Sequence, residues 1–379
     1  MSVHTVVGRG AASVPLPSDD PFYGPVSSVP GPGELIRSRR VSVVHDTVRA
    51  AWQLVHGSTG ARGQAIAVSG TVLLPNRPWR GPGEQPVLTF GVGVHGLGRD
   101  AAPSHLMVAG AEPELDLVAG ALDRGWVVLV TDGDGLGMPG PHTYGAGHPG
   151  GHAMLDIVRA APVAVPSLSR HAPVLCWGYS EGGRCAAWAG ELQPSYAPEL
   201  PLVAVAAGGV PADLRAVAKA IDGGPFSGLG LAVLVGLAHA HQDPQLLAIL
   251  TPEGRVAADR ASRADVVGLV VDHPEPMHEH TVRTEPWDEP CWRALLDRER
   301  NGRLRPEVPV LVYHVAGDVL VPTELGRELA HDYGARGADV EWLLLDAPDH
   351  LTGALVGSGP ALAWLAARLA ESVRSPHPA

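Results

Sequence analysis

Residues 174–184 read Val-Leu-Cys-Trp-Gly-Tyr-Ser-Glu-Gly-Gly-Arg. The apolar run Val174–Trp177 precedes a Gly-x-Ser-x-Gly pentapeptide around Ser180, and Arg184–Ala189 has the pattern of a helix start. A strand, a tight glycine turn and a helix together expose a serine hydroxyl above the edge of a sheet. The pentapeptide alone is weak evidence for a nucleophilic serine, and its position directly after an apolar run strengthens that evidence. The stretch predicts a nucleophilic serine at a strand-to-helix turn, and the alternative is a purely structural turn.

Short apolar runs alternate with segments of helical length along most of the chain. Apolar runs without polar alternation are typical of strands that helices cover on both faces, as in a mostly parallel sheet. These runs are Pro86–Phe90, Trp126–Thr131, Val174–Trp177, Val203–Ala207, Val308–His314 and Val340–Leu345. A glycine-containing turn between Ala51–Val55 and Ala65–Leu74 adds a hairpin signal. We therefore predict an α/β fold with a mostly parallel central sheet flanked by helices.

The chain divides into three parts by composition. Residues 1–40 are rich in Pro, Gly and Ser and predict an extended N-terminal arm. Residues 41–210 and 307–379 carry the alternating strands and helices of the core, which the helical repeat Pro360–Val373 closes. Residues 211–306 interrupt the alternation, and an insertion of this size predicts a cap over the carboxyl edge of the sheet. An ordinary extra helical layer is the alternative.

A serine hydroxyl needs a base and an orienting acid to become nucleophilic at neutral pH. In a sheet of this type the three residues follow in the order serine, acid, histidine, each after a later strand. Asp318 and His350 each follow an apolar run of strand length, on the side where Ser180 is expected. Asp346 and Asp349 are rival acids, but they lie too close in sequence to His350 to approach its far nitrogen easily. We predict the triad Ser180, Asp318 and His350.

An oxyanion hole needs two backbone N–H groups that point at the developing charge. One is expected from Glu181, which follows the nucleophile, and the other from the loop Gly91–Arg99 after the strand Pro86–Phe90. This loop also spells G-x-G-x-x-G. No helix opens directly after it, and no acidic residue ends a strand about 20 positions on, so we do not predict a nucleotide site.

Composition excludes several other classes of function. The formal net charge is −12, Lys219 is the only lysine, and there is no basic stripe with interleaved aromatic residues, so nucleic-acid binding is not expected. Three cysteines without regular spacing argue against a disulfide framework and a zinc knuckle, and indicate small buried side chains. Among 18 histidines, His273, His278 and His280 cluster near Glu279, but the prolines around them predict solvated loop residues. No metal site is therefore predicted.

The N-terminal residues contain no continuous apolar core of signal-peptide length. The longest apolar run, Leu229–Ala238, is too short to span a bilayer and indicates a buried helix. No transmembrane segment is expected, and the chain is predicted to be a soluble protein that is not exported.

Several ordered blocks give the chain a resemblance to the secretory lipase family of α/β-hydrolases, from about Asp20 to the end. The blocks are DPFYGPVSSVPGPGELIRSR, AVSGTVLLP, HGLGRDAAPS, RGWVVLVTDGDGLG, PHTY, GYSEGG, GGVPADL, GDVLVP and DH. The resemblance implies an α/β-hydrolase fold with a helical cap and an acyl-binding tunnel. It also implies no cofactor, hydrolysis of fatty acyl or simpler esters, and a triad at the three residues predicted above.

The chain departs from the family pattern at several positions. Members usually carry glycine or glutamine where this chain has Glu181, whose N–H still serves while its carboxylate adds charge beside the nucleophile. Arg99 matches a position where the family commonly has an aspartate, so its N–H is the second expected oxyanion donor. Cysteines expected near Ala101 and Gly334 in exported members are missing, which fits a reducing compartment and a cytoplasmic location.

The sequence thus predicts a cofactor-free carboxylic ester hydrolase that works through an acyl-enzyme on Ser180. Its expected partner is a small-molecule acyl ester. Two alternatives remain open. The same triad in a dry site could pass the acyl group to an alcohol or close a lactone, a reaction that the change at Arg99 leaves possible. A protein that binds a ligand in the cap pocket without catalysis is the other.

Overall fold

A single mixed sheet forms the centre of the computed structural model, which describes residues 14–374. The first 13 residues of the expected arm lie outside the described residues. In spatial order the strands are β1 (Leu35–Val41), β2 (Val48–Thr59), β3 (Ala65–Pro75), β5 (Val127–Gly133), β4 (Val87–Gly91), β6 (Val174–Tyr179), β7 (Leu202–Gly208), β8 (Val310–Val315) and β9 (Val340–Leu345). The pairings from β1 to β5 are antiparallel, and those from β5 to β9 are parallel. The prediction of a mostly parallel sheet is confirmed.

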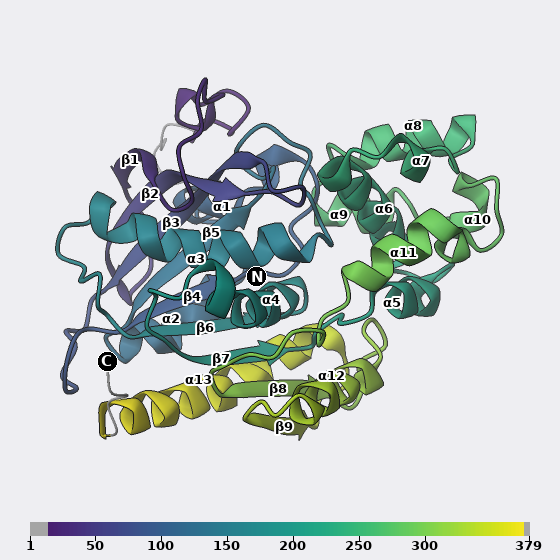
Figure 1. Cartoon of the computed structure of the whole chain (residues 1–379). Helices are drawn as coiled ribbons and strands as arrows, with labels where there is room; N and C mark the ends of the chain where they lie inside the picture. The colour runs from purple at the N-terminus through teal and green to yellow at the C-terminus, as the bar shows by residue number, and fades with distance from the viewer. Residues whose placement is uncertain (1–13, 375–379) are drawn as a thin grey trace, which may run out of the picture.

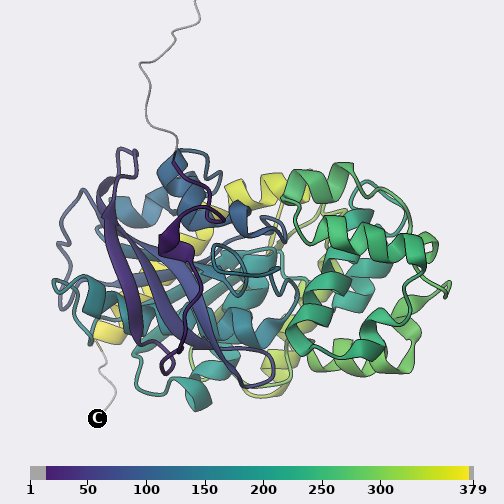
Figure 2. The same cartoon turned by 90° about the horizontal axis from the view of Figure 1, so that it is seen from above.

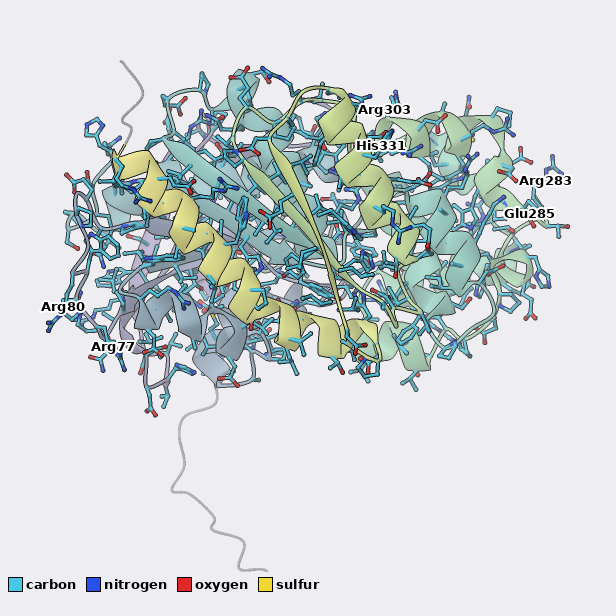
Figure 3. All side chains as sticks on the ribbon, turned by 90° about the horizontal axis from the view of Figure 1, so that it is seen from below. Arg77, Arg80, Arg283, Glu285, Arg303 and His331 are labelled. Carbon is cyan, nitrogen blue, oxygen red and sulfur yellow. The ribbon has the colours of Figure 1, made fainter. Side chains whose placement is uncertain are left out.

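Helices cover both faces of this sheet (Figure 1). One face packs against α3 (Gly147–Ala164), α4 (Glu181–Tyr196) and α12 (Thr323–Ala335), and the other against α1 (Pro103–Ala109), α2 (Leu115–Asp123) and α13 (His350–Arg374). Seen from below, α13 runs diagonally over the part of the sheet that contains β6 to β9 (Figure 3). In β8, Val310 and Val312 enter one core, while Leu311 and Tyr313 enter the other. Burial on both sides explains why the strand reads as a continuous apolar run.

Two element bounds differ from the sequence-based expectation. The edge strand β1 includes the last residues of the stretch that was expected to be an extended arm. Its sequence is mostly polar, and the apolar alternation that predicts a strand lies in its partner β2. The last helix, α13, begins at His350, although Pro360 is a typical first residue of a helix. The helix continues through Pro360 because its first turns are packed on the sheet, where Gly353 and Gly357 lie against Tyr179 and Tyr313.

The segment between β7 and β8 folds into helices that lie together at one end of the sheet (Figures 1 and 2). They are α5 (Leu214–Ile221), α6 (Ser227–His241), α7 (Pro244–Leu247), α8 (Pro252–Ala261), α9 (Val266–Val271), α10 (Met277–His280) and α11 (Pro290–Arg298). The helix α6 is buried almost all round and forms the centre of a separate apolar cluster. Charged side chains such as Arg283 and Glu285 lie at the outer rim (Figure 3). The boundaries 211 and 306 stay a prediction.

A buried charge network connects this helical segment to the core. Arg184 on α4 is 0% exposed, and its Nη2 donates to the backbone carbonyl of Glu299 at 2.6 Å. The carboxylate of Glu299 accepts from His241 Nε2 at 3.0 Å and from the backbone N–H of Gly147 at 2.7 Å. Burial alone would raise the pKa of Glu299, but the His241 hydrogen bond and the Arg184 charge hold it below its usual value. The network therefore depends on an ionised Glu299.

We expect Glu299→Gln to lower the free energy of unfolding by about 3–5 kcal/mol, because it leaves the buried Arg184 without a counter-charge. Glu328→Gln is the matched control, since Glu328 is exposed and, within residues 14–374, pairs only with Arg300 at 3.4 Å. That variant is expected to change stability by less than about 1 kcal/mol. Urea unfolding measures both. Equal, small losses in the two variants would contradict a stabilising role for the Arg184–Glu299 pair.

Candidate active site

Ser180 lies at a sharp turn between β6 and α4. Its backbone has φ 59° and ψ −125°, a left-handed conformation that is uncommon for a residue with a side chain. Two glycines allow the turn through close approach of the backbone. A Cβ at Gly178 would collide with the carbonyl of Gly182, and one at Gly182 would collide with the carbonyl of Gly91 at the end of β4. The glycines of the pentapeptide are thus required by the packing of α4 onto the sheet.

The structure brings the three predicted triad residues together. His350 Nε2 lies 2.8 Å from Ser180 Oγ, and His350 Nδ1 lies 2.6 Å from Asp318 Oδ2. Because Asp318 accepts from Nδ1, the neutral imidazole carries its proton there and leaves Nε2 free to accept from the serine hydroxyl. His350 is the first residue of α13, and Asp318 lies on the loop after β8. The geometry is that of a nucleophile, a base and an orienting acid.

The carboxylate of Asp318 is fully buried and accepts four hydrogen bonds. Oδ1 accepts from the backbone N–H groups of Leu320 and Val321 at 3.0 and 2.8 Å. Oδ2 accepts from His314 Nε2 at 3.0 Å as well as from His350. Burial would raise the pKa of Asp318, but the bonds from the two histidines hold it well below its usual range. Asp318 is therefore an anion throughout the neutral range.

Sequence reasoning missed His314. The signal that could have found it is a histidine inside a buried strand, four residues before the candidate acid.

The rival acids have other surroundings. Asp349 accepts from the backbone N–H and the hydroxyl of Thr352 at 2.8 and 2.9 Å, which places it at the first turn of α13. Asp346 is exposed. Asp318 is the acid that contacts the histidine.

Glu181, the first residue of α4, has a buried carboxyl beside the nucleophile. Its Oε1 accepts from the backbone N–H of Gly145 at 3.3 Å, and its Oε2 has no hydrogen-bond partner among the described residues. Burial raises the pKa of Glu181, and the nearby Arg184 charge offsets part of this rise. The neutral acid therefore persists to a higher pH than in an ordinary glutamate.

Arg99 lies on the short helix η2 (Arg99–Ala101), eight residues after β4 ends. Its guanidinium donates to the backbone carbonyls of Gly137, Pro17 and Tyr23 at 2.8–3.0 Å. These bonds attach Arg99 to the N-terminal segment. The stretch that lies against the Ser180 turn is the end of β4, where the Gly91 carbonyl faces Gly182. Arg99 as an oxyanion donor stays a prediction.

A narrow apolar pocket of about 20 Å³ lies over Ser180. Most of its lining comes from the helical segment, through Leu214, Val217, Ala218, Ile221, Leu229, Gly230 and Val233. Tyr144, Pro211, Leu320 and Val321 complete it. The ring of Tyr179 lies 4.9 Å from that of His350 and covers the base. Ser180 is therefore half-buried under apolar groups that belong mainly to α5 and α6.

The histidines near Glu279 do not form the solvated loop that the sequence suggested. His273 and His280 are buried, and only His278 is exposed. For His280 the cause is a single helical turn, α10, which places Met277 and His280 on one inner face. Residues 14–374 contain no group of three or more His, Cys, Asp or Glu side chains placed to hold a metal ion. In the same range, no helix is long and apolar enough to cross a membrane.

The sheet order, the sharp turn at Ser180 and the placement of Asp318 and His350 after later strands define an α/β-hydrolase. The model of the family described as secretory lipase matches residues 102–375, more than half of the chain. The chain belongs to the secretory lipase family, as the resemblance predicted. It is therefore an enzyme of the carboxylic ester hydrolase class.

Known relatives and structures agree with this membership. Lipase A of Moesziomyces aphidis is 28% identical over 376 residues, which cover 93% of this chain and 80% of the relative. A secreted triacylglycerol lipase of Malassezia globosa is 26% identical, over 94% of this chain and 82% of the relative. The closed state of Candida antarctica lipase A superposes with a TM-score of 0.85 at 26% identity, over 95% of this chain and 88% of that structure.

The prediction of a cytoplasmic location is wrong. The family is that of the secretory lipases, and the Malassezia relative is a secreted enzyme, which points to an extracellular location. The prediction relied on missing disulfide cysteines and on the lack of an apolar N-terminal core of signal-peptide length. A chain of 379 residues buries a large apolar core and needs no disulfide for stability, so the lack of these cysteines does not indicate a reducing compartment.

We expect Glu181→Gln to gain activity relative to the wild type as pH rises. Below the raised pKa of Glu181 both side chains are neutral; above it the wild type carries a buried charge that opposes negative charge developing near Ser180. The ratio of kcat/KM for ester hydrolysis, variant over wild type, should rise about tenfold from acid to alkaline pH. Glu253→Gln, at an exposed position of α8, is the control. A flat ratio would mean that Glu181 keeps one protonation state across the range.

Proposed function

We propose that this enzyme hydrolyses carboxylic esters through an acyl-enzyme on Ser180. The observation that supports the proposal is the continuous hydrogen-bonded series from Ser180 Oγ through His350 to Asp318. His350 Nε2 takes the hydroxyl proton while Oγ attacks the acyl carbon, and the same nitrogen then protonates the leaving alcohol. A water molecule that gives its proton to His350 next attacks the acyl-enzyme and releases the carboxylic acid. Asp318 stabilises the imidazolium that forms in both halves.

The negative oxygen of each tetrahedral intermediate needs backbone donors. The N–H of Glu181 is one, because it is the first N–H of α4 and lies at the positive end of the helix dipole. The loop after β4 supplies the other, with Arg99 as the candidate from the sequence. Because a carboxylate at Glu181 would oppose the oxyanion, catalysis favours its neutral form.

We infer that residues 211–306 act as a cap over the core formed by residues 41–210 and 307–379. The apolar lining from α5 and α6 is suited to an acyl chain. A cavity of about 20 Å³ holds little more than one water molecule, so the cap has to move before an acyl chain enters. We therefore expect the substrate to be a small-molecule acyl ester whose apolar acid portion lies under the cap.

The direct test is the hydrolysis of p-nitrophenyl esters from acetyl to palmitoyl by the wild type and by Ser180→Ala. Loss of the nucleophile should lower kcat by at least about 10³-fold for every ester. Ser167→Ala, at an exposed serine in the turn after α3, is the matched control and should keep full activity. Activity that survives in Ser180→Ala would disprove the triad. A wild type that reacts with a fluorophosphonate at Ser180 but turns over no ester in water would instead favour acyl transfer or lactone formation.

Ala218→Leu tests the acyl pocket. Ala218 is 3% exposed on α5 and lines the space over Ser180, so a larger side chain fills room that an acyl chain needs. The ratio of palmitoyl to acetyl ester kcat/KM should fall about tenfold, which corresponds to the loss of one or two buried methylene contacts. Ala220→Leu, on the exposed side of the same helix, is the control. An unchanged ratio in a folded variant would place the acyl chain elsewhere.

A further inference from the structure

A second histidine lies behind the proposed triad. His314 is fully buried on β8, and its Nε2 lies 3.0 Å from Asp318 Oδ2 and 3.0 Å from the backbone carbonyl of Val321. Both neighbours accept hydrogen bonds, so Nε2 carries the hydrogen and donates it to them. Nδ1 has no hydrogen-bond partner among the described residues. The imidazole tautomer with its proton on Nε2 satisfies both acceptors, whereas a second N–H at Nδ1 would be buried without an acceptor.

The ring of His314 is closely packed by its neighbours. A Cβ at Gly326 of α12 would lie 2.7 Å from His314 Nδ1 and 2.9 Å from the ring of Trp342 on β9. The imidazole is therefore held between the first turns of α12 and the neighbouring strand. This packing directs Nε2 at Oδ2 of Asp318, the same oxygen that contacts His350 at 2.6 Å. Two histidines thus share one carboxylate oxygen.

We propose that His314 is a positioning residue for the reaction of Ser180, a proposal that rests on the proposed function. It acts in two ways through Asp318. Its hydrogen bond, with those from Leu320 and Val321, prevents the carboxylate from rotating away from His350. It also takes part of the charge of Oδ2, so the carboxylate stabilises the imidazolium of His350 enough to assist proton transfer without trapping it.

Two ionisable groups near this pair, Tyr179 and Asp349, keep one protonation state in the neutral range. Burial raises the pKa of Tyr179, whose ring packs on His350 from β6, far above its ordinary value. Hydrogen bonds from Thr352 lower the pKa of Asp349, which adjoins His350. Glu181 is the exception, because burial raises its pKa, so the pH profiles of the His314 variants are compared in a Glu181→Gln background.

His314→Leu removes the donor and His314→Gln supplies an amide N–H near the place of Nε2. We expect kcat for p-nitrophenyl ester hydrolysis to fall about tenfold or more in His314→Leu, with KM little changed, because a hydrogen bond to a charged group is lost. The acid limb should move to higher pH, since the unshared charge of Asp318 favours the imidazolium of His350. His314→Gln should recover most of kcat and the wild-type acid limb.

Thermal unfolding of each variant separates an effect on catalysis from an effect on folding. If His314→Leu does not fold, His314→Asn replaces it, because the asparagine amide is too short to reach Oδ2 of Asp318. Wild-type kinetics in His314→Leu or His314→Asn would overturn the proposal. If kcat falls equally in His314→Gln and His314→Leu and the acid limb does not move, His314 has a structural role only. Failure of the proposed function is distinct, since Ser180→Ala would then remain active.

Discussion

The hydrogen bond between His350 Nδ1 and the buried carboxylate of Asp318 is the interaction on which the site depends. A carboxylate removed from water is costly unless donors surround it. Four donors converge on Asp318, from two histidines and two backbone N–H groups. They come from β8, from the loop that follows it and from α13, so the charge can be buried only when these elements are in register. The parallel edge of the sheet provides that register, because successive strands end on the same side.

The same edge explains what sequence reasoning achieved. The strands from β4 to β9 are largely apolar, and Ser180, Asp318 and His350 each follow one of them in the expected order. Their convergence follows from local pattern together with one topological rule. The sequence also indicated that Gly178 and Gly182 are required. The reason, the close contact of α4 with the end of β4, is seen only in the folded structure.

What the sequence did not indicate depends on contacts between distant segments. In the sequence His314 looks like any other buried residue of a strand. Its contacts with Asp318 and Val321 form only because the loop after β8 folds back against it. Arg99 sits in the expected loop, but its bonds to Pro17 and Tyr23 come from a segment about 80 positions earlier. His280 looked solvated because prolines surround it, whereas one turn of helix hides it. In each case tertiary packing decides the environment, and local propensity carries no information about it.

The helical segment contacts the core through two unlike surfaces. Near its end, His241 on α6 contacts Glu299, which pairs with the buried Arg184 of α4. This ion pair resists separation because parting it would leave two ions in an apolar interior. Toward the start of the same helix, Leu229 and Val233 lie over Ser180 and contribute apolar contacts alone. At about 1.5 Å per residue these two parts of α6 lie about 12–18 Å apart. Apolar contacts are exchanged for an apolar ligand at little cost, whereas buried ion pairs are not. Under the proposed function, an acyl chain displaces the contacts over Ser180 more readily than those at Glu299, and the segment stays attached to α4.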